Sequence, residues 1–350
     1  MDKEEEKLNI LFTSAGRRGY LIEYFKQELG ENGEVFAANS SEISTAFSVA
    51  DHSVLVPLIY DEGYISFLLN YCRLNDIKAI IPLFDVDLPV LAKNRTKFLD
   101  IGVNVIVSEP EVIAICNDKW KTYNFLKKEK MNTAETFVCV IDALKAIKEG
   151  RIKYPLIIKP RWGMGSIAIF EAENEDELHI LYEKSKQKIM QTYLKYESKE
   201  SIDEAVLIQE KLIGQEYGLD IINDLEGNYQ NTICKQKYAM RSGETDCAVT
   251  VENEKLQKAG ERLSGILSHR GNLDVDVFMV GGKPYILEMN ARFGGGYPFS
   301  HMSGVNLPKA IIEWLRGKTV DPSLLKGRLH IMSQKGIYLV RLYPNNNGKN

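Results

Sequence analysis

The chain has 350 residues, more than one hydrophobic core normally accommodates, so the sequence predicts two or three subdomains. A net charge of −4 argues against a dominant nucleic-acid role, because proteins that bind the phosphate backbone usually carry a basic excess. No apolar run approaches the roughly 18 residues of a membrane span, and the five cysteines contain no C-x-x-C pair, so we expect a cytoplasmic protein with reduced thiols and no membrane partner.

Strands and helices alternate over the first part of the chain, as is typical of a parallel α/β sheet. Apolar strands are predicted at residues 8–13, 35–38, 79–83 and 103–107, with helices at about 20–29, 62–75 and 87–99. These elements predict a doubly wound sheet of four or more strands over residues 8–110.

The turn after the first strand contains Gly16-x-x-Gly19, which raises the alternative of a dinucleotide site. The spacing differs from G-x-G-x-x-G, and no acidic residue closes the second strand where a ribose partner would lie. An NAD-dependent oxidoreductase built on this domain is therefore the less favoured alternative. Arg17 and Arg18 at the helix start either hold an anionic substrate or are solvated surface residues.

Asp85 and Asp87 follow a buried strand, at the end of an open sheet where ligands gather. Capping of the next helix is the alternative for both. Further along the chain, a helix is predicted over residues 117–126 with Asn117 as its N-cap. Lys119 then lies near the helix start, where acidic residues are more common, and a bound anion would explain this cation.

A small antiparallel sheet is predicted from strands at residues 136–140, 154–160 and 167–170, followed by a charged helix and connection over 174–203. Lys159 ends an apolar strand directly before a glycine-containing loop at 161–166. An unpaired buried ammonium is costly, so an anionic partner is expected, with a lysine that reaches water as the alternative.

Residues 206–221 predict a strand that breaks at Gly214 and then resumes. A broken strand exposes backbone groups that a purine edge can use, and Glu210 and Glu216 could bind its amine side and the ribose hydroxyls. Both glutamates could equally be ordinary surface residues. The stretch 232–246 carries several cations and is expected to face a charged ligand.

A hairpin is predicted from the alternating segments 271–278 and 285–290, joined by a turn at Val280–Pro284. This hairpin would place Asp276 beside Glu288, and alternation would put Glu288, Asn290 and Arg292 on one face. Two carboxylates about 4 Å apart repel by roughly 4 kcal/mol at an effective dielectric near 20, so such a pair usually attracts a cation.

Oxygen ligands of this kind suit Mg²⁺ or Mn²⁺ completed by phosphate oxygens and water, and a solvated acidic face is the alternative. The Gly294-Gly295-Gly296 run next to the acids favours a bound phosphate, because its backbone amides are bare. Helices are predicted at about 252–268 and 306–316, and a weak strand at 336–340.

The order of these parts resembles the ATP-grasp superfamily, and in particular members similar to the large subunit of carbamoyl phosphate synthase. The resemblance covers roughly residues 8–320. Its motifs are Ile157-Ile158-Lys159-Pro160, Ile208-Gln209-Glu210-Lys211-Leu212 and Leu287-Glu288-Met289-Asn290-Ala291-Arg292. It implies an α/β chain with α+β grasp lobes, in which a doubly wound parallel sheet precedes a two-lobed ATP-grasp domain.

The resemblance implies a Rossmann-like pre-ATP-grasp domain over residues 1–113. A small lobe with the phosphate loop would then span 114–203, and a large lobe with the metal site and the C-terminal segment 204–350. The expected nucleotide-binding residues are Lys119, Lys159, Gly163, Met164, Gly165, Ser166, Glu210, Lys211, Leu212 and Glu216. The expected metal ligands are Asp276, Glu288 and Asn290. Arg292, which would face the reacting phosphate, and Lys237 are the expected catalytic residues.

Two departures from the family pattern concern the metal site. Asp276 stands where relatives more often have Glu or Gln, so its shorter side chain could shift the metal geometry. Ala291 replaces a common proline, which weakens the rigidity of the loop and removes no ligand.

The resemblance implies an ATP-dependent ligase that joins a small-molecule carboxylate to an amine or a thiol through an acyl phosphate, with Mg-ATP (or Mn-ATP) between two lobes. The expected partners are these small-molecule substrates, with a possible homodimer because relatives are often dimers. One grasp unit without a glutaminase argues against a full carbamoyl phosphate synthase. A non-catalytic ATP-binding module of a larger assembly is the main alternative. The substrate pocket is expected at residues 14–19, 85–87, 241–246 and 297–301.

Overall fold

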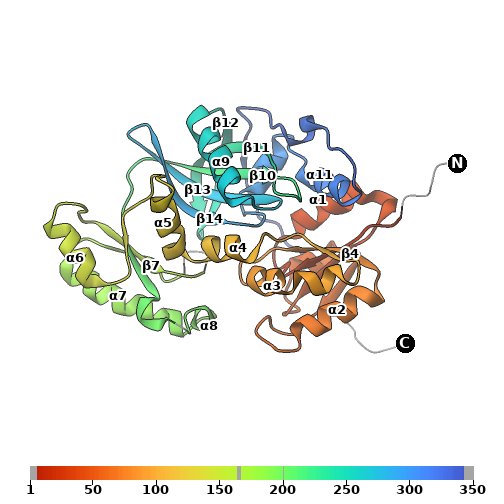
Figure 1. Cartoon of the computed structure of the whole chain (residues 1–350), viewed down its shortest axis with the longest axis horizontal. Helices are drawn as coiled ribbons and strands as arrows, with labels where there is room; N and C mark the ends of the chain where they lie inside the picture. Colours follow the sequence, from red (N-terminus) through yellow and green to blue (C-terminus); the bar gives the residue numbers. More distant parts are fainter. Residues whose placement is uncertain (1–5, 164–166, 200, 343–350) are drawn as a thin grey trace.

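The computed structural model describes residues 6–163, 167–199 and 201–342. Three sheets follow one another along the described chain (Figure 1). Figure 1 shows the sheet of the middle segment at one end of the molecule and the N-terminal sheet toward the other, with the C-terminal sheet between them. The fold is therefore the expected parallel α/β domain followed by two antiparallel lobes.

The N-terminal sheet has the order β3-β2-β1-β4-β5, and all its strand pairs are parallel. Its elements are β1 (Asn9–Thr13), α1 (Gly19–Leu29), β2 (Val35–Asn39), β3 (His52–Leu55), α2 (Tyr64–Leu74), β4 (Ile77–Pro82), α3 (Asp87–Leu99), β5 (Asn104–Val105) and α4 (Pro110–Asn117), with 3₁₀ turns at Gly30–Asn32 and Thr45–Ser48. Ile10 and Phe12 share a core with α1, whereas Leu11 shares a core with α2 and α3. Helices thus cover both faces, which is why β1 is apolar without interruption.

The middle sheet has the order β6-β9-β7-β8, with antiparallel pairing throughout. Its elements are α5 (Lys119–Lys128), β6 (Thr136–Phe137), α6 (Val140–Lys148), β7 (Leu156–Pro160), β8 (Phe170–Ala172), α7 (Glu175–Met190), α8 (Leu194–Glu197), a 3₁₀ turn at Ile202–Glu204 and β9 (Val206–Glu210). The strand predicted at 167–170 was wrong, because Ala168 has a left-handed φ of 56° and pairing begins only at Phe170. We call this unit the small lobe.

The N-cap predicted at Asn117 was also wrong. Asn117 ends α4, and its amide donates to the backbone oxygen of Asp85 at 2.7 Å. Asp118 caps α5 instead, since its Oδ1 accepts from the backbone N–H of Trp120 and of Lys121.

The C-terminal sheet has the order β14-β13-β10-β11-β12-β15 and forms what we call the large lobe. Its elements are β10 (Gln215–Asn223), β11 (Tyr229–Arg241), β12 (Glu244–Val251), α9 (Glu254–Leu267), β13 (Asn272–Val280), β14 (Lys283–Asn290), α10 (Tyr297–Met302), α11 (Leu307–Leu315), a 3₁₀ turn at Pro322–Leu325 and β15 (Met332–Gln334). The predicted hairpin and the helices near 252–268 and 306–316 are confirmed. The strand predicted at 336–340 was wrong, because the edge of β12 pairs with residues 332–334 and leaves the apolar residues that follow exposed.

The expected boundary between the lobes, after residue 203, falls before β9. Since β9 pairs with β6 and β7, we propose that the small lobe extends to Glu210.

The three units do not share their hydrophobic cores equally. Phe25 of α1, Tyr297 of α10 and Ile311 of α11 belong to one core, so the N-terminal domain and the large lobe pack together. The sheet of the small lobe has a core of its own around Leu156 and Leu178, whereas Leu126 of α5 belongs to a core shared with the N-terminal domain and the large lobe. A cleft beside this sheet can therefore change its width without opening a shared core, while α5 stays with the rest.

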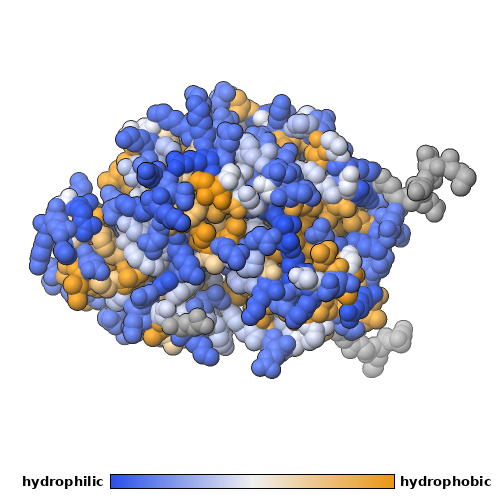
Figure 2. All heavy atoms as spheres, in the orientation of Figure 1, coloured by the Kyte–Doolittle hydropathy of each residue, from blue (hydrophilic) through white to orange (hydrophobic). Residues whose placement is uncertain are grey.

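The face shown in Figure 2 is mostly hydrophilic, and apolar side chains appear on it in separate patches. Every helix in the part of the chain that the structure describes is too short or too polar to cross a bilayer. All five cysteines are unpaired, and burial raises the pKa of the Cys72, Cys116 and Cys234 thiols to about 12, which keeps them unreactive.

The Asp118 carboxylate caps α5 and also receives two hydrogen bonds of 2.8 Å from the buried Arg161 guanidinium. We predict that Asp118→Ala lowers the free energy of unfolding by about 3–5 kcal/mol, because it leaves Arg161 buried without its main partner. Glu204→Ala, which removes the half-exposed partner of Arg161 at 2.7 Å, should cost under about 1 kcal/mol. Urea unfolding monitored by circular dichroism compares the two, and equal losses would contradict this account.

Candidate functional site

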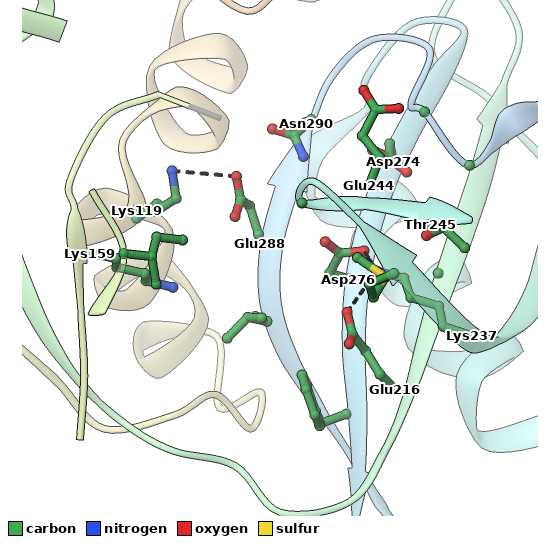
Figure 3. Close-up of a pocket in the computed structure, with 18 of the residues that line it drawn as sticks. Lys119, Lys159, Glu216, Lys237, Glu244, Thr245, Asp274, Asp276, Glu288 and Asn290 are labelled. Carbon is green, nitrogen blue, oxygen red and sulfur yellow. Dashed lines mark hydrogen bonds and ion pairs between the residues drawn. The ribbon is translucent and has the colours of Figure 1, made fainter. Parts of the chain in front are cut away.

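A cavity of about 470 Å³ is lined by both lobes, and Arg18 adds a side chain from the N-terminal domain (Figure 3). Most expected site residues line it together, namely Lys119, Lys159, Gly163, Glu210, Lys211, Leu212, Glu216, Lys237, Asp276, Glu288, Asn290 and Arg292. Met164, Gly165 and Ser166 lie outside the described residues. Groups separated by more than 170 positions in the sequence thus converge on one space.

Lys119 and Lys159 form the cationic wall of the small lobe. Lys119 lies in the first turn of α5, where it donates to the carbonyl of Gly163 and lies 3.4 Å from Glu288. Lys159 ends β7 and is buried, with its Nζ donating to the neutral side chain of Gln209 at 2.8 Å. Burial lowers the pKa of Lys159 to about 8, an effect that Glu288 opposes and Lys119 reinforces. An anion bound between the lysines would relieve this cost.

Glu210, Lys211 and Leu212 lie where the chain passes from the small lobe to the large lobe. Glu210 ends β9, and its Oε2 accepts from the backbone N–H of Glu135 at 3.3 Å. Lys211 pairs with Glu171 of β8 at 2.5 Å. The segment that joins the two sheets therefore borders the cleft, as expected for a broken strand, and the first part of the predicted strand ends at Glu210.

Lys237 lies between two carboxylates of neighbouring strands. Its Nζ is 2.7 Å from Glu216 Oε1 and 2.6 Å from Asp276 Oδ1. Burial disfavours the ammonium, but Asp276 and Glu216 outweigh this cost and raise the pKa of Lys237. Lys237 is thus a permanent cation whose first role in the structure is to hold the two acids together, and Figure 3 shows this group across the cavity from Lys119 and Lys159.

The hairpin of β13 and β14 pairs Asp276 with Glu288 and Asp274 with Asn290, as the alternation predicted for the first pair. Arg292 departs from the expected strand face, because β14 ends at Asn290. Its guanidinium contacts Asp85 at 2.9 Å and Asp274 at 3.1 Å. The arginine therefore joins the large lobe to the N-terminal domain while still lining the cavity.

The expectation that residues 85–87 line the cavity was wrong: Asp85 contacts the site only through Arg292, and Asp87 does not contact it. Asp87 is buried within the N-terminal domain, where it accepts from the Ser14 hydroxyl at 2.7 Å. Neither residue is the N-cap of α3, which is Val86.

Sequence reasoning missed Asp274. Asp274 lines the cavity, and burial raises its pKa to about 6 against the opposing effect of Arg292. The alternation that placed Asp276 could have found it, since Asp274 lies two residues before Asp276 on the same strand.

Lys235 belongs to the stretch 232–246 that was expected to face a charged ligand, and it lines the cavity. Its ammonium forms a buried ion pair with Asp220, which also accepts from Ser300.

A family model described as "PylC-like, N-terminal domain" matches residues 10–106, and a model of the ATP-grasp domain matches residues 116–296, half of the chain. The chain belongs to the ATP-grasp family. Among its curated relatives, the carbamoyl phosphate synthase large chain of Clostridium acetobutylicum is 24% identical over 84% of this chain and 27% of that protein. The arginine-specific large chain of Halalkalibacterium halodurans is 21% identical over 91% of this chain and 30% of that protein. This ATP-grasp chain therefore spans less than a third of these relatives.

Solved structures show the same ATP-grasp fold at low identity. The biotin carboxylase domain of Hydrogenobacter thermophilus 2-oxoglutarate carboxylase, in complex with MgADP, ADP and bicarbonate, has a TM-score of 0.70 at 16% identity, covering 93% of this chain and 73% of that one. N5-carboxyaminoimidazole synthetase from Staphylococcus aureus with ADP gives 0.67 at 17% identity, covering 91% and 80%. The L-amino acid ligase from Bacillus licheniformis gives 0.68 at 16% identity, covering 93% and 79%.

We predict that binding of MgATP weakens as the pH rises through about 8. The pKa of Lys159 in the free protein is about 8, so the ammonium that a phosphate needs is lost above this pH. The dissociation constant should rise about tenfold between about pH 7 and 9, the change in the charged fraction over that range. Calorimetric titration measures it, and Lys159→Met should bind more weakly with no such rise. A wild-type affinity that is flat across this range would contradict the assignment.

Proposed function

We propose that this chain is an ATP-dependent ligase that joins a small-molecule carboxylate to an amine or a thiol through an acyl phosphate. One observation carries the proposal. Lys119 and Lys159, the Asp276–Glu288 pair and Arg292 line a single cavity between two lobes. A triphosphate needs several cations around it and a polar group on the reacting phosphate, and this cavity provides both from separate elements.

The proposed position of the nucleotide follows from the walls of the cavity. Its phosphates lie between Lys119 and Lys159, beside Gly163. Its base lies along the connection at 210–212, and its ribose near Glu216. The separate core of the small-lobe sheet allows the wall that carries Lys159 to close over the nucleotide and to exclude water.

A magnesium ion fits Asp276, Glu288 and Asn290, which supply hard oxygen donors from facing positions of one hairpin. No group of three or more His, Cys, Asp or Glu side chains is placed to hold a metal ion by itself within the described residues. Phosphate oxygens and water would therefore complete the ligand set, which is usual for Mg²⁺ with nucleotides, and Mn²⁺ would suit the same donors. When bound, the ion offsets negative charge on the phosphates.

In the proposed reaction the protein forms no covalent bond to the substrate. An oxygen of the substrate carboxylate attacks the γ-phosphorus of ATP, the bond to the β–γ bridging oxygen breaks, and ADP leaves. The nucleophile then attacks the acyl carbon and gives up its proton, and phosphate leaves. Arg292 stabilises charge on the transferring phosphoryl group. Asp85 and Asp274 are positioning residues, since they fix the direction of the Arg292 guanidinium.

Two further features belong to the proposal. The unpaired cysteines agree with a reducing cytoplasm. A homodimer is the assembly to test first by light scattering, because one structural neighbour is described as a dimer. A non-catalytic ATP-binding module remains the competing function, and tight MgATP binding without turnover for any substrate pair would favour it.

We predict that Glu288→Gln lowers ADP release by at least about 100-fold, because it removes one charge from the Asp276–Glu288 pair and leaves the side-chain shape. ADP release is measured with MgATP, a panel of carboxylates and hydroxylamine, which traps an acyl phosphate as a hydroxamate. The thermal unfolding midpoint should stay within about 2 °C of the wild type, because loss of the Lys119–Glu288 pair is offset by relief of the repulsion between Asp276 and Glu288.

Glu226→Gln is the matched control, since Glu226 is exposed on the turn between β10 and β11. This variant should turn over at the wild-type rate. Full activity of Glu288→Gln would show that the reacting phosphate does not bind beside Glu288.

A further inference from the structure

The cavity has two chemically different ends. One end carries Lys119 and Lys159, which the proposed function assigns to phosphates. The other end is lined by Arg18, Glu244, Asp274 and Arg292. Figure 3 shows Asp274 and Glu244 on the far side of Asn290 from the two lysines. We call this second part the far end. Arg18 and Glu244 lie outside the proposed position of the nucleotide.

The acids and cations of the far end lie on one wall of the cavity. Arg18 and Arg292 both donate to the carbonyl of Phe293, and Arg292 also contacts Asp274 at 3.1 Å. These groups and Glu244 line the cavity where the N-terminal domain meets the large lobe.

Arg18 is the cation of the far end that lacks an acidic partner. Its Nη1 donates to the carbonyl of Phe293, and no carboxylate lies within ion-pair distance of it in the described part of the chain. Burial and the neighbouring Arg292 lower the pKa of Arg18, so the guanidinium is held against a like charge. Arg292 itself is already paired with Asp85 and Asp274. A free anion is the missing partner of Arg18.

Glu244 offers an opposite charge on the neighbouring wall. Its carboxylate lies over Gly295, where a Cβ atom would be 3.2 Å from Glu244 Cδ. Its only ion-pair partner among the described residues is Lys335 at 3.0 Å, and both side chains reach solvent. Such a surface pair is weak and exchanges readily, so Glu244 can bind a ligand cation in its place.

The charges of the far end balance. Among the residues that line it, Arg18 and Arg292 offset Asp274 and Glu244. A ligand with a net charge would leave that charge uncompensated when it is buried, whereas a ligand with one positive and one negative group would not. A plain carboxylate would satisfy Arg18 alone, a plain amine would satisfy Glu244 alone, and a dicarboxylate would bring its second charge against Glu244 and Asp274.

We propose that Arg18 and Glu244 form a subsite for the zwitterionic head group of an α-amino acid. Arg18 binds the carboxylate beside Arg292, and Glu244 binds the ammonium. This inference rests on the proposed ligase function and makes the amino acid its carboxylate substrate. The ammonium held at Glu244 keeps its proton and is no nucleophile, so a second molecule supplies the amine or thiol.

Binding of amino acids tests the subsite directly. The twenty standard amino acids are titrated calorimetrically into the protein with Mg²⁺ and a non-hydrolysable ATP analogue. The tightest one is then compared with its analogue lacking the amino group and its analogue lacking the carboxylate. We expect each analogue to bind at least about tenfold more weakly, as is usual when a charge-assisted contact is lost. Equal binding of the des-amino analogue, or no binding by any amino acid, overturns the inference.

Two variants separate the roles of the residues. Arg18→Ala should raise the dissociation constant of both the amino acid and its des-amino analogue by roughly 10- to 100-fold, and Arg18→Lys should recover part of the loss. Glu244→Gln should weaken only the amino acid, because the des-amino analogue has no ammonium. Equal weakening of both ligands by Glu244→Gln would show a purely structural effect and contradict the proposal.

Arg73→Ala is the matched control, since Arg73 is exposed on α2 and does not line the cavity. It should change neither constant. Nucleotide affinity should be unchanged in all the variants, because Arg18 and Glu244 lie away from the lysines.

The outcomes also separate this inference from the proposed function. If amino acids bind but no carboxylate supports ADP release, the ligase function fails and the subsite stands. If plain carboxylates support ADP release and no amino acid binds, the ligase stands and the subsite is overturned.

Discussion

Repulsion between carboxylates that face each other across the β13–β14 hairpin is the constraint on which this site depends. Asp276 lies opposite Glu288, and Asp274 lies next to Asp276 on the same strand face. Each acid receives a cation from another element, as in the Lys237–Asp276, Lys119–Glu288 and Arg292–Asp274 pairs. The cations that neutralise the hairpin are therefore the same groups that line the cavity, so stability and chemistry use one set of residues.

These ion pairs also connect the three units of the chain. Lys119 belongs to the small lobe and pairs with the large lobe, whereas Arg292 belongs to the large lobe and pairs with Asp85 of the N-terminal domain. The two links differ in their surroundings. The N-terminal domain and the large lobe share an apolar core, but the small lobe has a separate one. The sheet that carries Lys159 can therefore move against a fixed floor, whereas Lys119 lies on α5, whose Leu126 is packed in a core of the N-terminal domain and the large lobe.

Alternation along strands made the middle of the site predictable. Glu288 and Asn290 follow each other at the strand period. The glycine turn at 281–282 sets the register as far as Val277–Ile286, and a register shift after it, which skips Leu287, brings Asp276 opposite Glu288. The same rule failed at Arg292, because the strand ends before it and the side chain turns toward Asp85. It also failed at 167–170 and 336–340, where apolar residues look like strands but Ala168 has a left-handed backbone and the edge strand pairs elsewhere.

The sequence by itself determined the order of the sheets, the positions of Lys119 and Lys159 at element ends and the acidic hairpin, because each depends on local periodicity or on a short motif. Only the tertiary structure decided which charges meet. These contacts join positions 21 to 275 residues apart in the chain, namely Asp85 with Arg292, Lys237 with Glu216, and Arg18 with Phe293. The physical reason is that ion pairing depends on distance in space, and packing of the N-terminal domain against the large lobe, which no local pattern encodes, sets that distance.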